Sequence, residues 1–200
     1  MRTYGILDGS ELIAEFVAPL TVRSNQPEFG TDALNLKRVI SRRSPQRWEI
    51  STNLEPLVYD ANKLFAHFVR HGHSSVFKIL MPQNYGVVKQ RTARSHKASA
   101  TAAINSETVS LASHTGLLPA GTFIKFDNHS KVYMVLEDCK SGNTSMKIYP
   151  RLRTAVSSTE FTCEDDVEMQ AQFDLDVVVG MVYTDGILMD MGTVKIIEAL

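Results

Sequence analysis

The sequence predicts a mainly β protein with one helix and a small barrel set between two outer segments. Three observations lead to this prediction. Short runs of alternating apolar and polar residues recur along the chain, and one stretch alone has helical spacing. A polar linker over residues 89–106, with few apolar residues to bury, separates the first part of the chain from the short strands that follow. Alternation is the period of a strand with one buried face, whereas apolar residues three and four apart mark a helix.

The first part of the chain contains a strand, the helix and a second strand. The strand over residues 46–54 alternates until Pro56, and its inward positions are Trp48, Ile50, Thr52 and Leu54. The helix is predicted over residues 60–71, with Asp60 as N-cap and Gly72 as the C-terminal stop. Its apolar face consists of Ala61, Leu64, Phe65, Phe68 and Val69. The second strand, from Val76 to Met81, closes at Pro82.

The middle of the chain predicts a small inserted barrel over residues 87–154. Its expected strands are Thr108–Leu111, Gly121–Phe126, Lys131–Leu136 and Met146–Tyr149. Turn residues at 127–129 and 141–143 separate them. Short strands at this density are typical of a small barrel. Beyond residue 153 the chain is strand-like again, at 177–179, 187–189 and 194–197.

The formal net charge of −1 conceals an uneven distribution. Residues 37–97 carry twelve Lys and Arg against three acids, whereas residues 154–200 carry ten acids against one Lys. Clustered basic residues are what phosphate contacts require, so one interpretation is nucleic-acid binding. Few aromatic residues interleave with the basic ones, which weakens that interpretation. The others are pairing of the basic and acidic segments, within a subunit or between neighbours, and plain solvated faces.

No catalytic or cofactor motif is present. His67 and His71 share a helix face, as two ligands of HExxH do, but Phe68 occupies the position of the Glu. A metal site would need these two residues to converge with His73, and ordinary polar roles are the favoured interpretation. Cys139 and Cys163 have no CxxC spacing and are expected to be reduced. No apolar run is long enough to cross a bilayer. We therefore expect a soluble protein that is not an enzyme and has no cofactor or metal.

Three short motifs occur in order in the inserted part: LPAGTFIKF at 118–126, KVY at 131–133 and MKIYPRLR at 146–153. The residues that define this pattern are Gly121, Lys131, Val132, Tyr133, Pro150 and Leu152. The pattern resembles that of the distal tail proteins of tailed bacteriophages. One departure is Thr122, which stands where the family often has Asp after the Gly.

The resemblance implies a β-sandwich or barrel core domain built from residues 1–86 and 155–200, with an OB-like barrel at 87–154 inserted into it. It also implies a hexameric ring at the tail tip of a virion assembled in the host cytoplasm. Such a ring joins the tail tube protein to hub, baseplate or fibre proteins. The alternative is a cytosolic single-stranded nucleic-acid-binding protein that uses the OB-like barrel.

On the leading interpretation, the named residues have structural or assembly roles. Gly121 is expected to supply a tight turn or bulge, while the barrel interior holds Val132, Tyr133, Ile148 and Leu152. The candidates for subunit or partner contacts are Arg42, Arg43, Arg47, Glu164, Asp165 and Asp166. A basic patch on one side and an acidic patch on the other suit the two different surfaces that each subunit of a ring presents.

Overall fold

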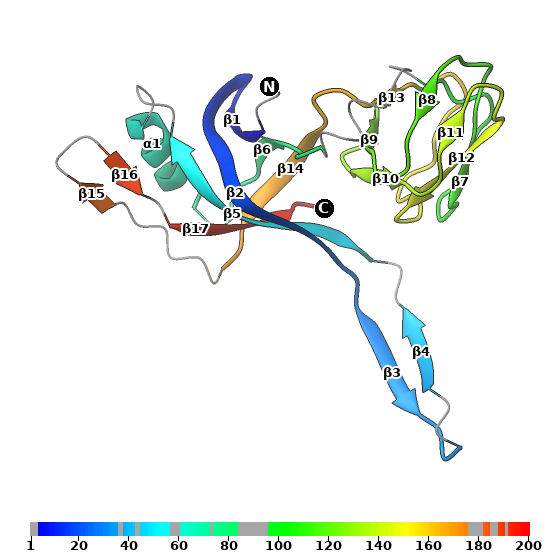
Figure 1. The fold of residues 1–200 in the computed structure, drawn as a ribbon, viewed down its shortest axis with the longest axis horizontal. Coiled ribbons are helices and arrows are strands. Elements are labelled where there is room, and N and C mark those ends of the chain that lie inside the picture. Colours follow the sequence, from blue (N-terminus) through cyan, green and yellow to red (C-terminus); the bar gives the residue numbers. More distant parts are fainter. Residues whose placement is uncertain are drawn as a thin grey trace.

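The computed structural model describes residues 4–35, 38–42, 45–56, 61–72, 74–83, 96–175, 182–184, 188–190 and 192–200. Within these residues there are seventeen strands and one helix, so the predicted mainly β fold is confirmed. The strands form two principal sheets, each with its own buried apolar cluster, and three smaller two-stranded pairs. Figure 1 shows the two principal units side by side, with a long ribbon leading away from them.

The first unit is a closed antiparallel barrel. Its six strands, in spatial order, are β1 (Gly5–Asp8), β2 (Glu11–Asn25), β5 (Arg47–Pro56), β17 (Thr193–Glu198), β14 (Glu168–Phe173) and β6 (Phe77–Leu80). Both ends of the chain contribute strands, since β17 pairs with β5. The alternation predicted from Trp48 to Leu54 is confirmed, because those positions are buried in β5.

Helix α1 (Ala61–His71) packs against the barrel through Leu64 and Phe68. Phe68 stacks on Phe173 of β14 with ring centroids 4.5 Å apart. Gly72 ends the helix with φ of +50°, and its amide donates to the Phe68 carbonyl at 2.9 Å. This is the left-handed stop that the sequence predicts. Asp60, the expected N-cap, lies outside the described residues.

The second unit is a sheet of five short strands. Their spatial order is β13 (Thr162–Cys163), β9 (Phe123–Phe126), β10 (Tyr133–Val135), β12 (Ser145–Tyr149) and β7 (Thr108–Ser110). Beside it lies the pair β8 (Leu117–Leu118) and β11 (Cys139–Lys140). Residues 96–99 bond to both edges: the Ser99 amide donates to Ser110 at 3.0 Å and the Ala98 amide to Glu160 at 2.9 Å. These bonds join the two edges and complete a small barrel.

The chain returns to the first barrel later than residue 154, the expected boundary. Val156 bridges to Ala102, and β13 pairs with β9, so residues 156–163 belong to the second unit. The first strand after the return is β14, which begins at Glu168. The other expected boundary, at residue 87, lies outside the described residues.

A two-stranded arm projects from the first barrel. Strands β2 and β5 run on beyond the barrel, and the chain between them forms the hairpin β3 (Glu28–Asp32) and β4 (Arg38–Arg42). Figure 1 shows this hairpin pointing away from both units. A further pair, β15 (Val182–Thr184) and β16 (Leu188–Asp190), precedes β17. The sequence made no prediction for the arm.

Candidate functional site

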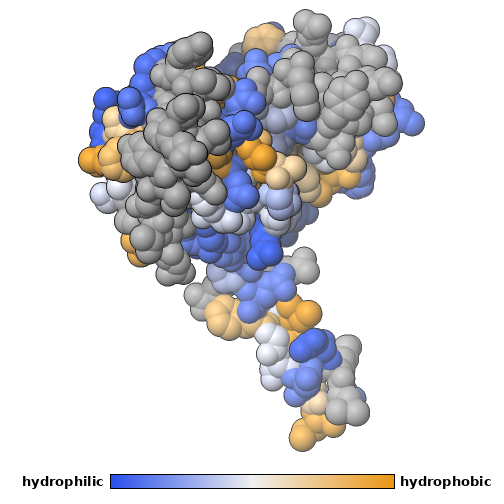
Figure 2. Space-filling model, turned by 60° about the vertical axis from the view of Figure 1, so that its left-hand side comes forward, coloured by the Kyte–Doolittle hydropathy of each residue, from blue (hydrophilic) through white to orange (hydrophobic). Residues whose placement is uncertain are grey.

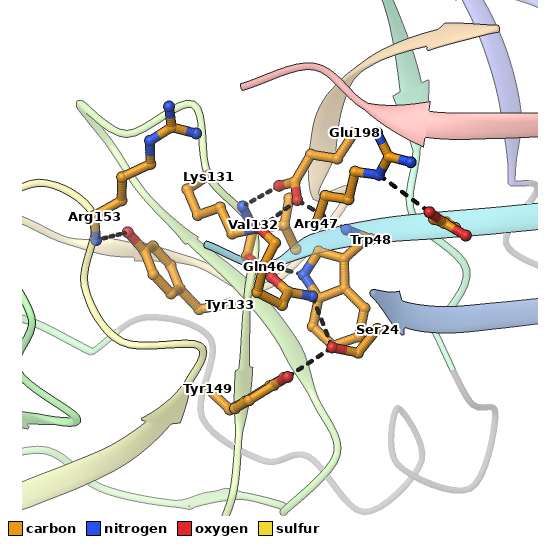
Figure 3. A network of polar contacts seen from close by, with 11 residues as sticks. Ser24, Gln46, Arg47, Trp48, Lys131, Val132, Tyr133, Tyr149, Arg153 and Glu198 are labelled. Carbon is orange, nitrogen blue, oxygen red and sulfur yellow. Dashed lines mark hydrogen bonds and ion pairs between the residues drawn. The ribbon is translucent and has the colours of Figure 1, made fainter. Parts of the chain in front are cut away.

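The two units meet at a junction built around one buried ion pair. Glu198, near the end of the chain, lies against the ammonium of Lys131, which precedes β10 of the second unit (Figure 3). Both side chains are almost fully buried. Burial lowers the pKa of Lys131, and the Glu198 carboxylate partly opposes that shift. A buried pair of this kind is stable only when its remaining hydrogen-bonding positions are filled.

Those positions are filled. The Glu198 carboxylate accepts hydrogen bonds from the backbone amides of Trp48 and Val132, each at 3.1 Å. Lys131 also donates to the backbone carbonyl of Gln46 at 3.1 Å. In the reverse direction the Trp48 indole donates to the Val132 carbonyl at 2.9 Å. All but one of these contacts cross from one unit to the other. The exception is the bond from the Trp48 amide, which holds the Glu198 carboxylate in place within the first barrel. Together they orient the two units relative to each other.

Aromatic and amide contacts extend the junction. The ring of Trp48 meets Phe123 and Tyr149 edge-on, with centroids 5.1 and 6.0 Å away. Gln83, just after β6, pairs with the backbone of Phe123 through two hydrogen bonds of 2.8 and 3.1 Å. The Tyr149 hydroxyl is 2.7 Å from that of Ser24 on β2. These contacts give the interface an apolar centre and polar partners on either side.

The residues expected in a turn and in the barrel interior are distributed over both units. Gly121 has φ of +84° in the turn before β9, which agrees with the expected tight turn. Tyr133, Ile148 and Leu152 lie in the apolar cluster of the second unit. Val132, by contrast, belongs to the cluster of the first barrel. It lies immediately before β10 and packs into the first barrel, whereas its neighbour Tyr133 packs into the second unit.

The remaining motif residues line a cavity of about 260 Å³ beside the junction. Lys131, Pro150 and Leu152 contribute to its wall, together with Arg151 and Arg153. Arg151 is paired with Glu107 at 2.8 Å. The lining contains no combination of nucleophile and base, so the cavity gives no indication of catalysis.

The expected basic contact group is only partly described. Arg43 lies outside the described residues, and of Arg42 only the backbone pairing with Glu28 is known. Arg47 is ion-paired with Glu49 of its own strand at 3.1 Å. The contact group of Arg42, Arg43 and Arg47 therefore stays a prediction.

The expected acidic group is divided by burial. Asp166 is exposed and Asp165 is half-buried, but the Glu164 side chain is fully buried, which corrects its assignment as a surface contact. Its carboxylate lies against His96 and accepts a hydrogen bond from the Thr162 hydroxyl at 3.0 Å. Three adjacent acids are typical of a solvated loop. Glu164 is buried instead because it follows β13 and lies on the same inward side as Thr162, two positions earlier.

Several basic residues of the middle segment take part in ion pairs where the structure describes them. Lys78 pairs with Glu168 at 2.8 Å, which joins the basic segment to the acidic one within a single subunit. The basic residues of this segment that take part in ion pairs are Arg38, Arg47, Lys63, Arg70 and Lys78. Lys89, Arg91 and Arg94 lie outside the described residues. In the described part, each of these five cations has an acidic partner within the same chain.

His67 and His71 do share a face, with ring centroids 4.2 Å apart, but they do not form a metal site with other described residues. Their expected third partner, His73, lies outside the described part of the chain. Among the described residues, the one group of three potential ligands is His96, His114 and Cys139. Nothing in the sequence indicates this group, because its members are 18 and 25 positions apart and follow no ligand-spacing motif.

The chain matches no protein-family model, and no curated protein is similar to it at a significant level. No helix in the described residues is long and apolar enough to span a membrane.

Proposed function

We propose that this protein is a structural component of a phage tail tip, a ring-forming distal tail adaptor that joins the tail tube to hub, baseplate or fibre proteins. The motifs in the second unit suggest the family. The observation that best supports the proposal is the arm formed by β3 and β4, which extends beyond the barrel and exposes apolar side chains. Figure 2 shows it projecting from the body with apolar surface toward its end.

The register of the arm gives its two faces different chemistry. Directly paired residues of antiparallel strands point to the same side, so Phe29 lies with Ser41, and Thr31 with Val39. That face has no charged residue over the paired positions. The opposite face carries Ile40 together with the ion pair of Asp32 and Arg38, at 3.4 Å. The uncharged face is therefore suited to packing against protein, and the charged face to water.

A second copy of this chain is the occupant that fits the arm. Phe29 and Val39 are 57% and 53% exposed, and covering the exposed half of such a side chain is worth about 1 kcal/mol. An isolated two-stranded hairpin is marginally stable by itself. In a closed ring every subunit donates one arm and receives one, so a small gain is repeated at each contact.

The junction supports the same function in a different way. An adaptor must hold its peripheral unit at a fixed angle if other tail proteins are to dock on it. The buried Lys131–Glu198 pair and the two bonds from Gln83 to Phe123 restrict that angle. The second unit then serves as a docking platform outside the tube, with no need to bind nucleic acid.

Two neighbouring residues of β4 provide a matched test. Val39 and Ile40 are 53% and 52% exposed but face opposite sides of the arm. We expect the wild-type chain to form sixfold rings with a central channel in electron micrographs, alone or with tail tube protein. Val39→Ser should reduce the ring population at least several-fold at equal concentration, because its face packs against the neighbour. Ile40→Ser should leave ring formation unchanged.

The proposal is overturned if the wild-type chain stays monomeric both alone and with tail tube protein. Equal effects of the two substitutions would show that the arm does not pack through its uncharged face. A gel-shift titration with single-stranded oligonucleotides tests the alternative function. Binding that weakens steeply as salt is raised would favour the nucleic-acid-binding protein over the tail adaptor.

A further inference from the structure

Three separate segments of the second unit bring His96, His114 and Cys139 together. His96 lies in the segment that closes the small barrel, His114 follows β7, and Cys139 begins β11. One potential ligand atom of each residue lies within 4.8 Å of the other two. The rings of the two histidines are 4.5 Å apart between centroids. Two imidazoles and a thiol are a donor set that zinc binds well.

His96 is oriented as a metal ligand by the groups around it. Its Nδ1 lies against the buried Glu164 carboxylate, which is itself held by the Thr162 hydroxyl at 3.0 Å. Its other nitrogen, Nε2, is buried and has no hydrogen-bond partner among the described residues. A carboxylate behind a histidine is the usual outer contact of zinc sites, because it fixes the tautomer and directs the free nitrogen at the metal.

His114 and Cys139 complete the arrangement. His114 Nδ1 is 3.3 Å from the backbone carbonyl of Ala112, a distance suited to donation, which leaves Nε2 as the acceptor nitrogen. That Nε2 is 3.6 Å from Cys139 Sγ. Tetrahedral zinc with its usual bond lengths separates a nitrogen and a sulfur ligand by about 3.6 Å. The pair therefore needs almost no movement to share one ion.

The charge and burial around the thiol also suit a cation. Cys139 is buried, so its sulfur faces the interior of the second unit. A bound cation would offset the negative charge of the Glu164 carboxylate that lies behind His96.

We propose that His96, His114 and Cys139 form a zinc site that fastens the closing segment of the small barrel to β11. The site holds the segment that joins both edges of the sheet, so the bound ion stabilises the second unit. This proposal is independent of the proposed function, since neither the arm nor the junction takes part in it.

The two cysteines provide the matched pair for the test. Full-length protein is stripped with a chelator under reducing conditions and dialysed against zinc, and its metal content is measured. We expect one zinc per wild-type chain and per Cys163→Ser chain, since the Cys163 thiol donates to the Asp165 carbonyl at 3.0 Å away from the cluster. Cys139→Ser and His114→Gln should lose most of the zinc. Saturating zinc should raise the wild-type unfolding temperature by roughly 5–10 °C.

A second measurement does not depend on the folding of any variant. Cobalt replaces zinc in such sites, and a thiolate ligand gives it a charge-transfer absorption in the near ultraviolet that wild type and Cys163→Ser should share. Wild-type protein that stays folded yet binds no stoichiometric zinc overturns the proposal. So does a cobalt derivative without the thiolate absorption, which would leave a thiol–imidazole hydrogen bond as the whole role of the pair.

Discussion

Two buried polar clusters of the first barrel differ in how completely they are partnered. At the junction, Glu198 accepts hydrogen bonds from two backbone amides and is ion-paired with Lys131. On the buried face of α1, His67 is as deeply buried, yet neither of its ring nitrogens has a hydrogen-bond partner among the described residues. The first cluster holds its charges in place, whereas the second tolerates no charge. Their responses to mutation and to pH should therefore be opposite in kind.

The largest effect is expected when the partnered cluster loses its anion. Glu198→Gln keeps the shape of the side chain but leaves the buried Lys131 ammonium without its counter-charge. Breaking a buried ion pair in this way costs about 3–5 kcal/mol in the free energy of unfolding. Urea unfolding measures the loss, and emission from Trp48, the single tryptophan, reports on the junction itself. A loss below about 1 kcal/mol would contradict the importance of the pair.

The unpartnered cluster should respond to pH instead. Burial, assisted by the neighbouring His71, lowers the pKa of His67 to about 4, while Asp8 partly opposes and Arg70 adds to the shift. Because the unfolded chain takes up this proton more readily than the folded one, stability is complete above about pH 6.5. It is lost as the pH falls toward about 4, by roughly 2–3 kcal/mol.

His67→Leu isolates that contribution. The variant keeps an apolar side chain against Phe77, whose ring centroid is 5.2 Å from that of His67, and carries no titrating group. The difference in stability between wild type and variant should change by roughly 2–3 kcal/mol between pH 7 and pH 4. His129, whose pKa is also lowered by burial, titrates in both proteins and cancels from the difference. A difference that does not vary with pH would show that His67 is accessible to water in the folded state.

A smaller effect is expected for a neutral part of the junction. Gln83→Leu removes both hydrogen bonds to the Phe123 backbone and leaves its amide and carbonyl groups without those partners. The expected loss is roughly 1–2 kcal/mol, below that of Glu198→Gln because no charge is left uncompensated. The same Trp48 emission measures it, since Phe123 contacts the indole edge-on. A loss equal to that of Glu198→Gln would show that charge has no special role at this junction.

The sequence predicted local elements well. The alternation around Trp48 depends on neighbours a few positions apart and is confirmed, as is the helix itself. The predicted apolar face of α1 is wrong in part, because Phe65 and Val69 are 41% and 69% exposed while His67 is buried. The junction depends on contacts between distant positions: Lys131 and Glu198 are 67 positions apart, and nothing near either residue indicates its partner. The arm was not predicted because β3 and β4 pair with each other outside the barrel. Neither face of the hairpin is buried in a core, so the sequence has no alternation of buried and exposed positions there.

Residues 160–164 show a different failure. Here Glu160, Thr162 and Glu164 are buried while Phe161 is exposed, so the hydropathy pattern indicates the wrong face. The inward side chains are polar because each meets a specific partner: Glu160 accepts from the amides of Asn128 and Ser157, and Glu164 from Thr162. A period-2 pattern identifies the buried face only when burial is apolar.

The smallest effect is expected at an exposed ion pair, which sets the lower limit of the comparison. Lys78 of β6 and Glu168 of β14 are diagonal neighbours on adjacent strands, with their charged groups 2.8 Å apart, but their side chains are 51% and 38% exposed. Water already stabilises both charges, so a double-mutant cycle with Lys78→Met and Glu168→Gln should give a coupling energy below about 1 kcal/mol. High salt should reduce it further, whereas the buried pair at the junction is shielded from ions. A coupling here as large as the loss in Glu198→Gln would mean that distance alone, and not burial with filled hydrogen-bonding positions, decides what an ion pair contributes to this fold.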